Sequence, residues 1–275
     1  MSHDHASGMG GIEADILRNM LQVLFGDTAA YVGGAVAEMP EARRANVVRI
    51  CKIALRKLGD GVSDAGEVPP RVIGCLLGDG SYCRDIAASE YWGGLVACSR
   101  SANPRDDRAA RRLKMLARLG EYQIRSHYLF YSTLRLLLMH FREPAKIDFE
   151  ENRLRLATFV PAGYYILAMD YNRDEISRMP KLISDVLYGL GQELLLEGSN
   201  TGADHYLKTV FTTNVTDVIR GEGIVFTPSV AGIQLYLWAF GVRDADSRYF
   251  LDPRLDCLID GVQMGVEESG LVYNP

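Results

Sequence analysis

The residues best suited to chemistry are cations that recur between positions 105 and 118. We call this set the basic series: Arg105, Arg108, Arg111, Arg112, Lys114 and Arg118. On a helix, Arg105, Arg108 and Arg112 would lie on one side, because residues three and four apart share a face. Guanidinium groups match phosphate oxygens, so the series predicts a site for nucleic acid or another phosphate-bearing ligand. The alternative is a solvated helix face that pairs with some of the 35 acidic residues.

Other reactive side chains form no recognisable catalytic pattern. The sequence has no GxSxG, HExxH or Walker motif, and no GxGxxG between a strand and a helix. His127 and His140 fall on an apolar segment and are expected as core or boundary residues, whereas His205 falls in a polar loop. His3 and His5 form an HxH pair in an expected terminal tail. We therefore expect no metal or other cofactor, and we keep an effector enzyme with an unfamiliar site as an alternative.

Composition indicates a soluble globular protein. The 275 residues are 48% hydrophobic and 24% charged, and the net charge of −5 argues against a surface devoted to nucleic acid or anionic membrane. Five cysteines without a CxxC pair are expected to be reduced and mostly buried. Residues 1–11 lack the pattern of a signal peptide, which favours the cytoplasm. Arg125 and Arg135 interrupt the apolar stretch 122–141, so no membrane span is expected.

Helical periodicity dominates the first half of the chain. After a flexible tail over residues 1–11, apolar spacing and helix-end residues predict a helical domain over residues 12–145. Asn103 and Pro104 are expected to begin the helix that carries the basic series. The expected helices cover residues 12–25, 40–58, 84–100, 103–119 and 121–141, with residues 28–39 as a loop or weak helix.

The second half, residues 146–275, mixes both periodicities. Alternation over residues 154–158 predicts a short strand, and one-sided apolar spacing predicts a helix over residues 181–192. Thr227 as cap and Pro228 in the first turn predict the start of the last helix. The full order is helix 181–192, strand 194–196, a long polar excursion 198–223, strand 224–226 and helix 227–241. This is the order of a winged helix with residues 198–223 as its wing, so the predicted fold is mainly α, with a helical N-terminal bundle followed by a winged-helix-like α+β module.

Residues 68–108, VPPRVIGCLLGDGSYCRDIAASEYWGGLVACSRSANPRDDR, resemble the Abi-alpha family of bacterial proteins. The resemblance rests on the Pro-Pro entry, the "YWGGLVA" helix and the "NPRDDR" turn, and it extends over about residues 40–140. The family is linked to abortive infection, in which phage-attacked cells are sacrificed. The resemblance therefore implies a cytoplasmic protein of antiviral defence, without implying any catalytic residue.

The charge of the winged-helix-like module favours a protein partner over DNA. The outward face of helix 181–192 carries one positive and one negative charge, and the wing has Asp204, Asp217 and Glu222 against Lys208 and Arg220. Each phosphate contact needs a cation, so this module is expected to bind DNA poorly. The candidate partner-contact residues on that face are Lys181, Ser184, Asp185, Tyr188 and Gln192.

Apolar residues surround helix 227–241, so that helix must be covered on more than one side. We expect the N-terminal bundle or a second copy of the chain to cover it, with Tyr236 and Trp238 as further contact residues and a homodimer as the assembly. The function expected from the sequence is a non-enzymatic defence or regulatory protein that acts through protein contact. The alternative is a nucleic-acid-binding regulator that uses the basic series.

Overall fold

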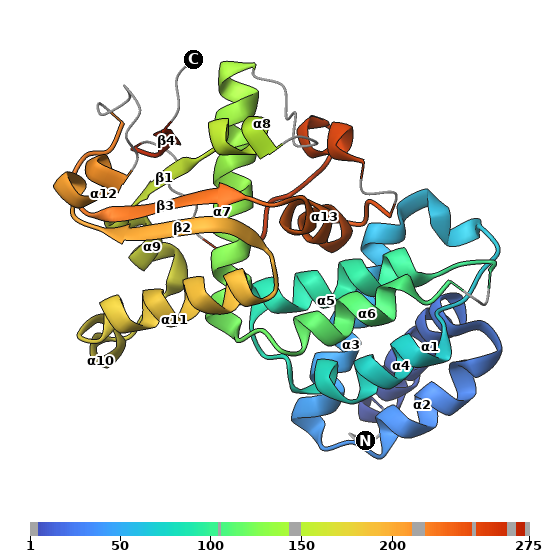
Figure 1. The fold of residues 1–275 in the computed structure, drawn as a ribbon. Helices are drawn as coiled ribbons and strands as arrows, with labels where there is room; N and C mark the ends of the chain where they lie inside the picture. Colours follow the sequence, from blue (N-terminus) through green and yellow to red (C-terminus); the bar gives the residue numbers. More distant parts are fainter. Residues whose placement is uncertain are drawn as a thin grey trace. The chain divides into compact units, whose positions relative to one another are not determined.

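The computed structural model describes residues 5–103, 106–142, 150–210, 218–243, 246–262 and 268–272. The chain divides into two compact units, Met1–Arg118 and Leu119–Pro275. The described residues are mainly helical and include a small four-stranded antiparallel sheet, which lies in the second unit (Figure 1). The predicted mainly α class is therefore confirmed.

The first unit consists of helices. Residues 5–11, expected as a tail, belong to its first helix, and residues 29–37, expected as a loop or weak helix, form a regular one. The helices are α1 (His5–Phe25), α2 (Ala29–Ala37), α3 (Glu41–Leu58), α4 (Pro70–Leu77), α5 (Ile86–Ser99) and α6 (Arg108–Leu116), joined in part by 3-10 turns at Gly26–Thr28, Gly59–Ser63 and Asp79–Tyr82. His3 lies outside the described residues.

Helix α5 is the buried centre of the first unit. Every residue from Ala87 to Ser99 is buried, and Gly93 allows close contact with α3. A Cβ added to Gly93 would stand 2.3 Å from Cγ2 of Ile53, a distance that no side chain tolerates. The small residue therefore sets the approach of α3 and α5.

Polar side chains of α3 hold the turn that precedes α5. The guanidinium of Arg43 donates to the hydroxyl of Ser81 at 2.8 and 2.9 Å, and the amide of Asn46 donates to the carbonyl of Ser81 at 2.9 Å. Arg49 donates to the Ser89 hydroxyl at 3.0 Å and to the Cys83 carbonyl at 2.8 Å. These polar groups are partly buried and paired, as burial requires.

One ion pair is buried inside the first unit. The ammonium of Lys57 lies 2.8 Å from a carboxylate oxygen of Glu90, and their side chains are only 8% and 9% exposed. Burial lowers the pKa of Lys57, and the neighbouring Glu90 carboxylate opposes that shift. Arg56, from the exposed side, contacts the other Glu90 oxygen at 2.5 Å.

One described segment, Asp15–Ala37, is long and apolar enough to cross a membrane by length and composition alone. Buried core helices of globular proteins pass the same test, and Leu24, Phe25 and Val32 on this segment are fully buried. All five cysteines are free thiols, four of them buried and Cys75 partly exposed.

The second unit combines helices with the sheet. Its helices are α7 (Glu121–Phe141), α8 (Glu150–Arg155), α9 (Ala162–Met169), α10 (Arg173–Ile176), α11 (Met179–Gln192), α12 (Asp204–Val210) and α13 (Val230–Ala239), with a 3-10 turn at Ser247–Leu251. Its strands are β1 (Thr158–Pro161), β2 (Leu196–Gly202), β3 (Gly223–Pro228) and β4 (Gly270–Leu271). The sheet order is β2-β3-β1-β4, with every pair antiparallel and a bulge in β2 between Leu196 and Gly198.

Helix α7 is the core element of the second unit, where it crosses behind the sheet (Figure 1). Its Phe130 ring stacks on Phe226 of β3 at 4.7 Å between centroids. Tyr128 and Arg135 bind the C-terminal segment: the Tyr128 hydroxyl donates to the Cys257 carbonyl at 3.1 Å, and Arg135 donates to the Phe250 carbonyl at 2.8 Å. The sequence placed the domain boundary at residue 145, but these contacts join α7 to the residues that follow it, and the boundary lies at 118.

Three further predictions about the second unit were wrong. Residues 154–155 end helix α8, and the expected strand begins later, at Thr158. The expected wing, 198–223, contains the rest of β2 and the helix α12, whose Leu207 packs with Phe159 and Val225; its residues 211–217, with Asp217, lie outside the described residues. Thr227 and Pro228 belong to β3, and Ser229 caps α13 by accepting from the Gly232 N–H at 2.9 Å.

Candidate functional site

The structure divides the basic series instead of gathering it. Helix α6 begins at Arg108, later than predicted from Asn103 and Pro104, and Arg105 and Pro104 lie outside the described residues. The carboxylates of Asp106 and Asp107, which precede the helix, each form an ion pair with an arginine. Both carboxylate oxygens of Asp106 accept from Arg108 at 2.9 Å, and Asp107 accepts from Arg71 at 2.7 Å. Within the basic series, a carboxylate therefore already occupies the Arg108 guanidinium, a group that a phosphate would use.

The remaining members of the basic series differ in exposure. Arg112 is half-buried, and burial lowers the pKa of its guanidinium, with Arg108 and Arg111 adding repulsion. Arg111, Lys114 and Arg118 are exposed. The described part of the series therefore offers a short exposed set in place of the six-residue surface that the sequence suggested.

All five residues predicted on the outward face of helix 181–192 are exposed on α11. Lys181 and Asp185 are its two charges, one of each sign, and Ser184, Tyr188 and Gln192 are neutral. The opposite face is buried through Ile183, Val186, Leu187 and Leu190. Tyr188 is 70% exposed and is the largest of the five side chains on the outward face.

Tyr236 and Trp238, expected to contact a partner, are buried in the folded chain. The Tyr236 hydroxyl lies 2.9 Å from the Ser132 hydroxyl of α7, and its ring contacts Phe250 at 5.6 Å between centroids. The apolar circumference of α13 is thus covered by the same chain. It gives no reason to expect a second copy, and the partner-contact candidates reduce to α11.

The end of α11 brings a large apolar side chain to the surface. The Leu195 N–H donates to the Leu190 carbonyl at 2.9 Å, and the Leu194 N–H donates to the Gly191 carbonyl at 2.9 Å, the two bonds of a Schellman motif. That motif needs a left-handed residue, usually glycine, at the position of Leu194, whose φ is +56°. Leu194 is also 71% exposed. Neither its backbone nor its solvation favours leucine here.

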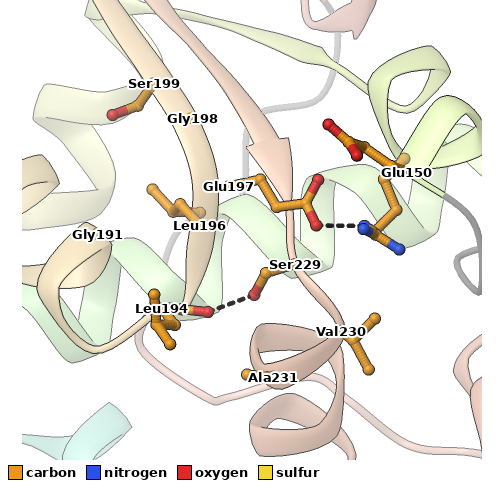
Figure 2. A pocket seen from close by; sticks show the side chains of 11 residues that line it. Glu150, Gly191, Leu194, Leu196, Glu197, Gly198, Ser199, Ser229, Val230 and Ala231 are labelled. Atoms are coloured by element: carbon orange, nitrogen blue, oxygen red, sulfur yellow. Dashed lines mark hydrogen bonds and ion pairs between the residues drawn. The ribbon is translucent and has the colours of Figure 1, made fainter.

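Leu194 borders a pocket of about 620 Å³ between α11, β2, α8 and the start of α13 (Figure 2). In Figure 2, Glu150 and Glu197 lie in the upper half of the view, and Leu194, Val230 and Ala231 lie in the lower half. The pocket is lined by Glu150, Arg153, Gly191, Leu194, Leu196, Glu197, Gly198, Ser199, Ser229, Val230 and Ala231. Its size lies within the usual range for ligand sites, on the order of 300–1,000 Å³.

Four hydrogen bonds fix the walls of this pocket. The Arg153 guanidinium donates to a carboxylate oxygen of Glu197 in an ion pair. The Ser229 hydroxyl donates to the Leu194 carbonyl at 2.7 Å, which ties the start of α13 to the end of α11. The Tyr131 hydroxyl, buried behind them, donates to the Leu195 carbonyl at 2.6 Å and accepts from the Ser229 N–H at 3.0 Å. The pocket therefore has a preformed frame.

Tyr188 lies next to the pocket on α11. Gly191, one of the lining residues, is three positions further along the helix, which places the two residues about one helical turn apart. An added Cβ at Gly191 would meet nothing within 4 Å, so the helix surface is open at this point. We call Tyr188, Gly191, Leu194 and the pocket the α11–β2 corner.

The histidines do not join this site. His127 is fully buried on α7, where its ring lies 4.5 Å from that of Tyr131 between centroids, and burial lowers its pKa to about 3. The prediction of a core residue is confirmed for His127. His140 and His205 are exposed, the latter on α12 and not in a loop. Among the described residues, no cluster of three or more His, Cys, Asp or Glu side chains could hold a metal ion.

Comparison of the chain with known protein families, with curated proteins and with solved structures finds no match. The resemblance of residues 68–108 to the Abi-alpha family stays a prediction. The α11–β2 corner combines residues that the sequence identified, above all Tyr188, with residues that it missed. Leu194 was assigned to a strand from three consecutive leucines, and no local pattern indicated its left-handed conformation.

Proposed function

We propose that this chain is a non-enzymatic protein that binds another polypeptide through the α11–β2 corner. The observation that carries the proposal is the pair of large exposed side chains there. Tyr188 is 70% and Leu194 71% exposed, and Leu194 also occupies a left-handed position that glycine would fill with less strain. A strained and exposed leucine lowers the stability of the free chain, so a role in binding accounts for its presence.

The charge of α11 supports a polypeptide over DNA as the partner. Lys181 and Asp185 cancel on its exposed face, whereas a helix in a DNA groove needs cations for the neighbouring phosphates. The order α11, β2, α12, β3, α13 differs from a winged helix by the helix α12 in place of the wing, and we propose that the module makes protein contact instead of DNA contact. The resemblance to the Abi-alpha family adds the setting: a cytoplasmic protein of bacterial phage defence.

Site-specific photo-crosslinking tests the proposal. A photoreactive phenylalanine analogue replaces Tyr188 in cells that produce the full chain, and in the control it replaces Tyr31 of α2, which is 69% exposed. We expect a discrete adduct from position 188 and none of that mass from position 31. The captured polypeptide is then identified by mass spectrometry and produced separately. Its affinity is measured for the wild-type chain and for Leu194→Gly.

The expected affinity loss for Leu194→Gly is at least about tenfold, as for an anchor residue at the centre of an interface. Identical adducts from both positions, or equal affinity of the two chains, would reject the proposal. Adducts with nucleic acid from position 188 would favour the DNA-binding alternative. The defence setting is tested separately, because deletion of the gene should increase plaque formation by at least one of several phages.

A further inference from the structure

We propose that the pocket of the α11–β2 corner binds a basic side chain, arginine or lysine, of the partner polypeptide. This inference rests on the proposed function, since it names the chemistry that the partner presents. It follows from the walls of the pocket, from their net charge and from the open surface at Gly191.

The walls suit the aliphatic part of a long side chain. Leu194, Leu196, Val230 and Ala231 supply apolar surface, and Leu194 and Val230 are large apolar residues that remain exposed. Gly191 leaves its side of the pocket open, with nothing within 4 Å of the position of an added Cβ. Lysine and arginine place their methylene stems along such surface and keep the charged group at a polar end.

The charges of the pocket favour a cation at its polar end, where Glu150, Arg153 and Glu197 lie. Glu150 and Glu197 contribute two negative charges and Arg153 one positive charge, so the lining carries a net charge of −1. Arg153 already pairs with Glu197, which leaves the exposed carboxylate of Glu150 to receive a guanidinium or ammonium group. In Figure 2 the carboxylates of Glu150 and Glu197 lie in the upper half of the view, and Leu194 and Val230 lie in the lower half, so the lining has a charged part and an apolar part.

An anionic ligand fits the same pocket less well. The start of α13 carries the partial positive charge of a helix N-terminus, about half an elementary charge, which is smaller than the net −1 of the lining. The Ser229 hydroxyl already accepts from the Gly232 N–H, so one of the free donors of that terminus is occupied. An anion at Arg153 would also have to displace the Glu197 carboxylate.

Titration of the isotope-labelled full chain with small amides tests this inference by NMR. The probes are the Nα-acetyl methylamides of arginine, lysine, norleucine and glutamate, which share one backbone and differ in the charge of the side chain. We expect the arginine and lysine probes to shift the amide signals of residues 194–199 and 230–231. Their affinities should exceed that of the norleucine probe, and the glutamate probe should bind most weakly.

Substitutions identify the carboxylate that receives the cation. Glu150→Gln should weaken binding of the arginine probe by about threefold, the effect of one partly exposed charge pair. Glu151→Gln is the matched control, because Glu151 is the next residue of α8, is also exposed and does not line the pocket, and it should leave the affinity unchanged.

Three outcomes would overturn the inference: tighter binding of the glutamate probe, equal binding of norleucine and lysine, or no shift with any probe at millimolar concentration. Each of them leaves the crosslink from position 188 intact, so the failure of the pocket chemistry and the failure of the contact surface are told apart. If the crosslink fails while the basic probes bind, the pocket has a ligand but the proposed function is wrong.

Discussion

Substitution of Leu194 tests whether the end of α11 is strained for the sake of binding. Two variants remove the same side chain: Leu194→Ala keeps the left-handed strain, and Leu194→Gly relieves it. A left-handed L-residue costs about 1–2 kcal/mol, and glycine gives back about 0.5–1 kcal/mol through the greater freedom of its unfolded chain. We therefore expect the glycine variant to be more stable than the alanine variant by about 0.5–1 kcal/mol.

Tyr188 provides the control on the same helix. At this interior helical position glycine should be less stable than alanine by about 1 kcal/mol, the reverse of the order at Leu194. The assay is urea unfolding followed by Trp238 fluorescence in a Trp92→Phe background, which reports on the second unit alone. All four variants should also bind the captured partner less tightly. If alanine equals or exceeds glycine in stability at position 194, the reasoning about strain is wrong.

The remaining predictions concern three other parts of the chain. Burial lowers the pKa of His127 from about 6.5 to about 3, so the folded state holds the neutral ring. The contribution of His127 to the free energy of unfolding is therefore full above pH 6.5. It falls as the pH decreases toward 3, by up to about 1.4 kcal/mol per pH unit. Urea unfolding between pH 7.5 and about 4 should show this slope reduced in His127→Gln, and an unchanged slope would contradict the assignment. Lys57→Met leaves the buried Glu90 carboxylate with Arg56 alone and should destabilise the chain by about 3 kcal/mol in thermal or urea unfolding, whereas adding Glu90→Gln should restore part of the loss. Duplex DNA should give no gel shift at low salt; a shift that is lost in Arg111→Glu with Lys114→Glu would instead support the nucleic-acid alternative.

Helices with strong local signals were predictable from the sequence. The helix expected over residues 121–141 matches α7, because the apolar residues that predict it all lie within this segment and the helix-breaking residues lie outside it. The exposed and buried faces of α11 also match, since a period of 3.6 residues assigns them without knowledge of the partner elements.

Elements that depend on distant residues were not predictable. The alternation over residues 154–158 fits a helix end as well as a strand, and β1 begins at Thr158 because Thr158 and the residues after it pair with β3, over sixty residues later. Thr227 and Pro228 resemble a helix start, but pairing of β3 with β2 keeps both extended and moves the cap to Ser229.

The candidate site was predictable in part. The exposure of Tyr188 follows from the periodicity of α11, whereas Leu194 was missed because leucine rarely adopts a left-handed conformation and no local pattern indicates it. The pocket joins α8, α11, β2 and α13, which only the tertiary fold brings together. The pairing of Arg108 with Asp106 was not predictable either, because the sequence does not show which carboxylate the guanidinium contacts.

The most direct test of the α11–β2 corner is the affinity of the polypeptide captured at position 188 for two matched variants. Gly191→Phe places a ring at the pocket, and Gly74→Phe places one on the exposed surface of α4; in both cases an added Cβ meets nothing within 4 Å. We predict that Gly191→Phe weakens binding at least about tenfold while Gly74→Phe binds like the wild type. Equal affinity of Gly191→Phe and the wild-type chain would contradict the proposal that this corner is the contact surface.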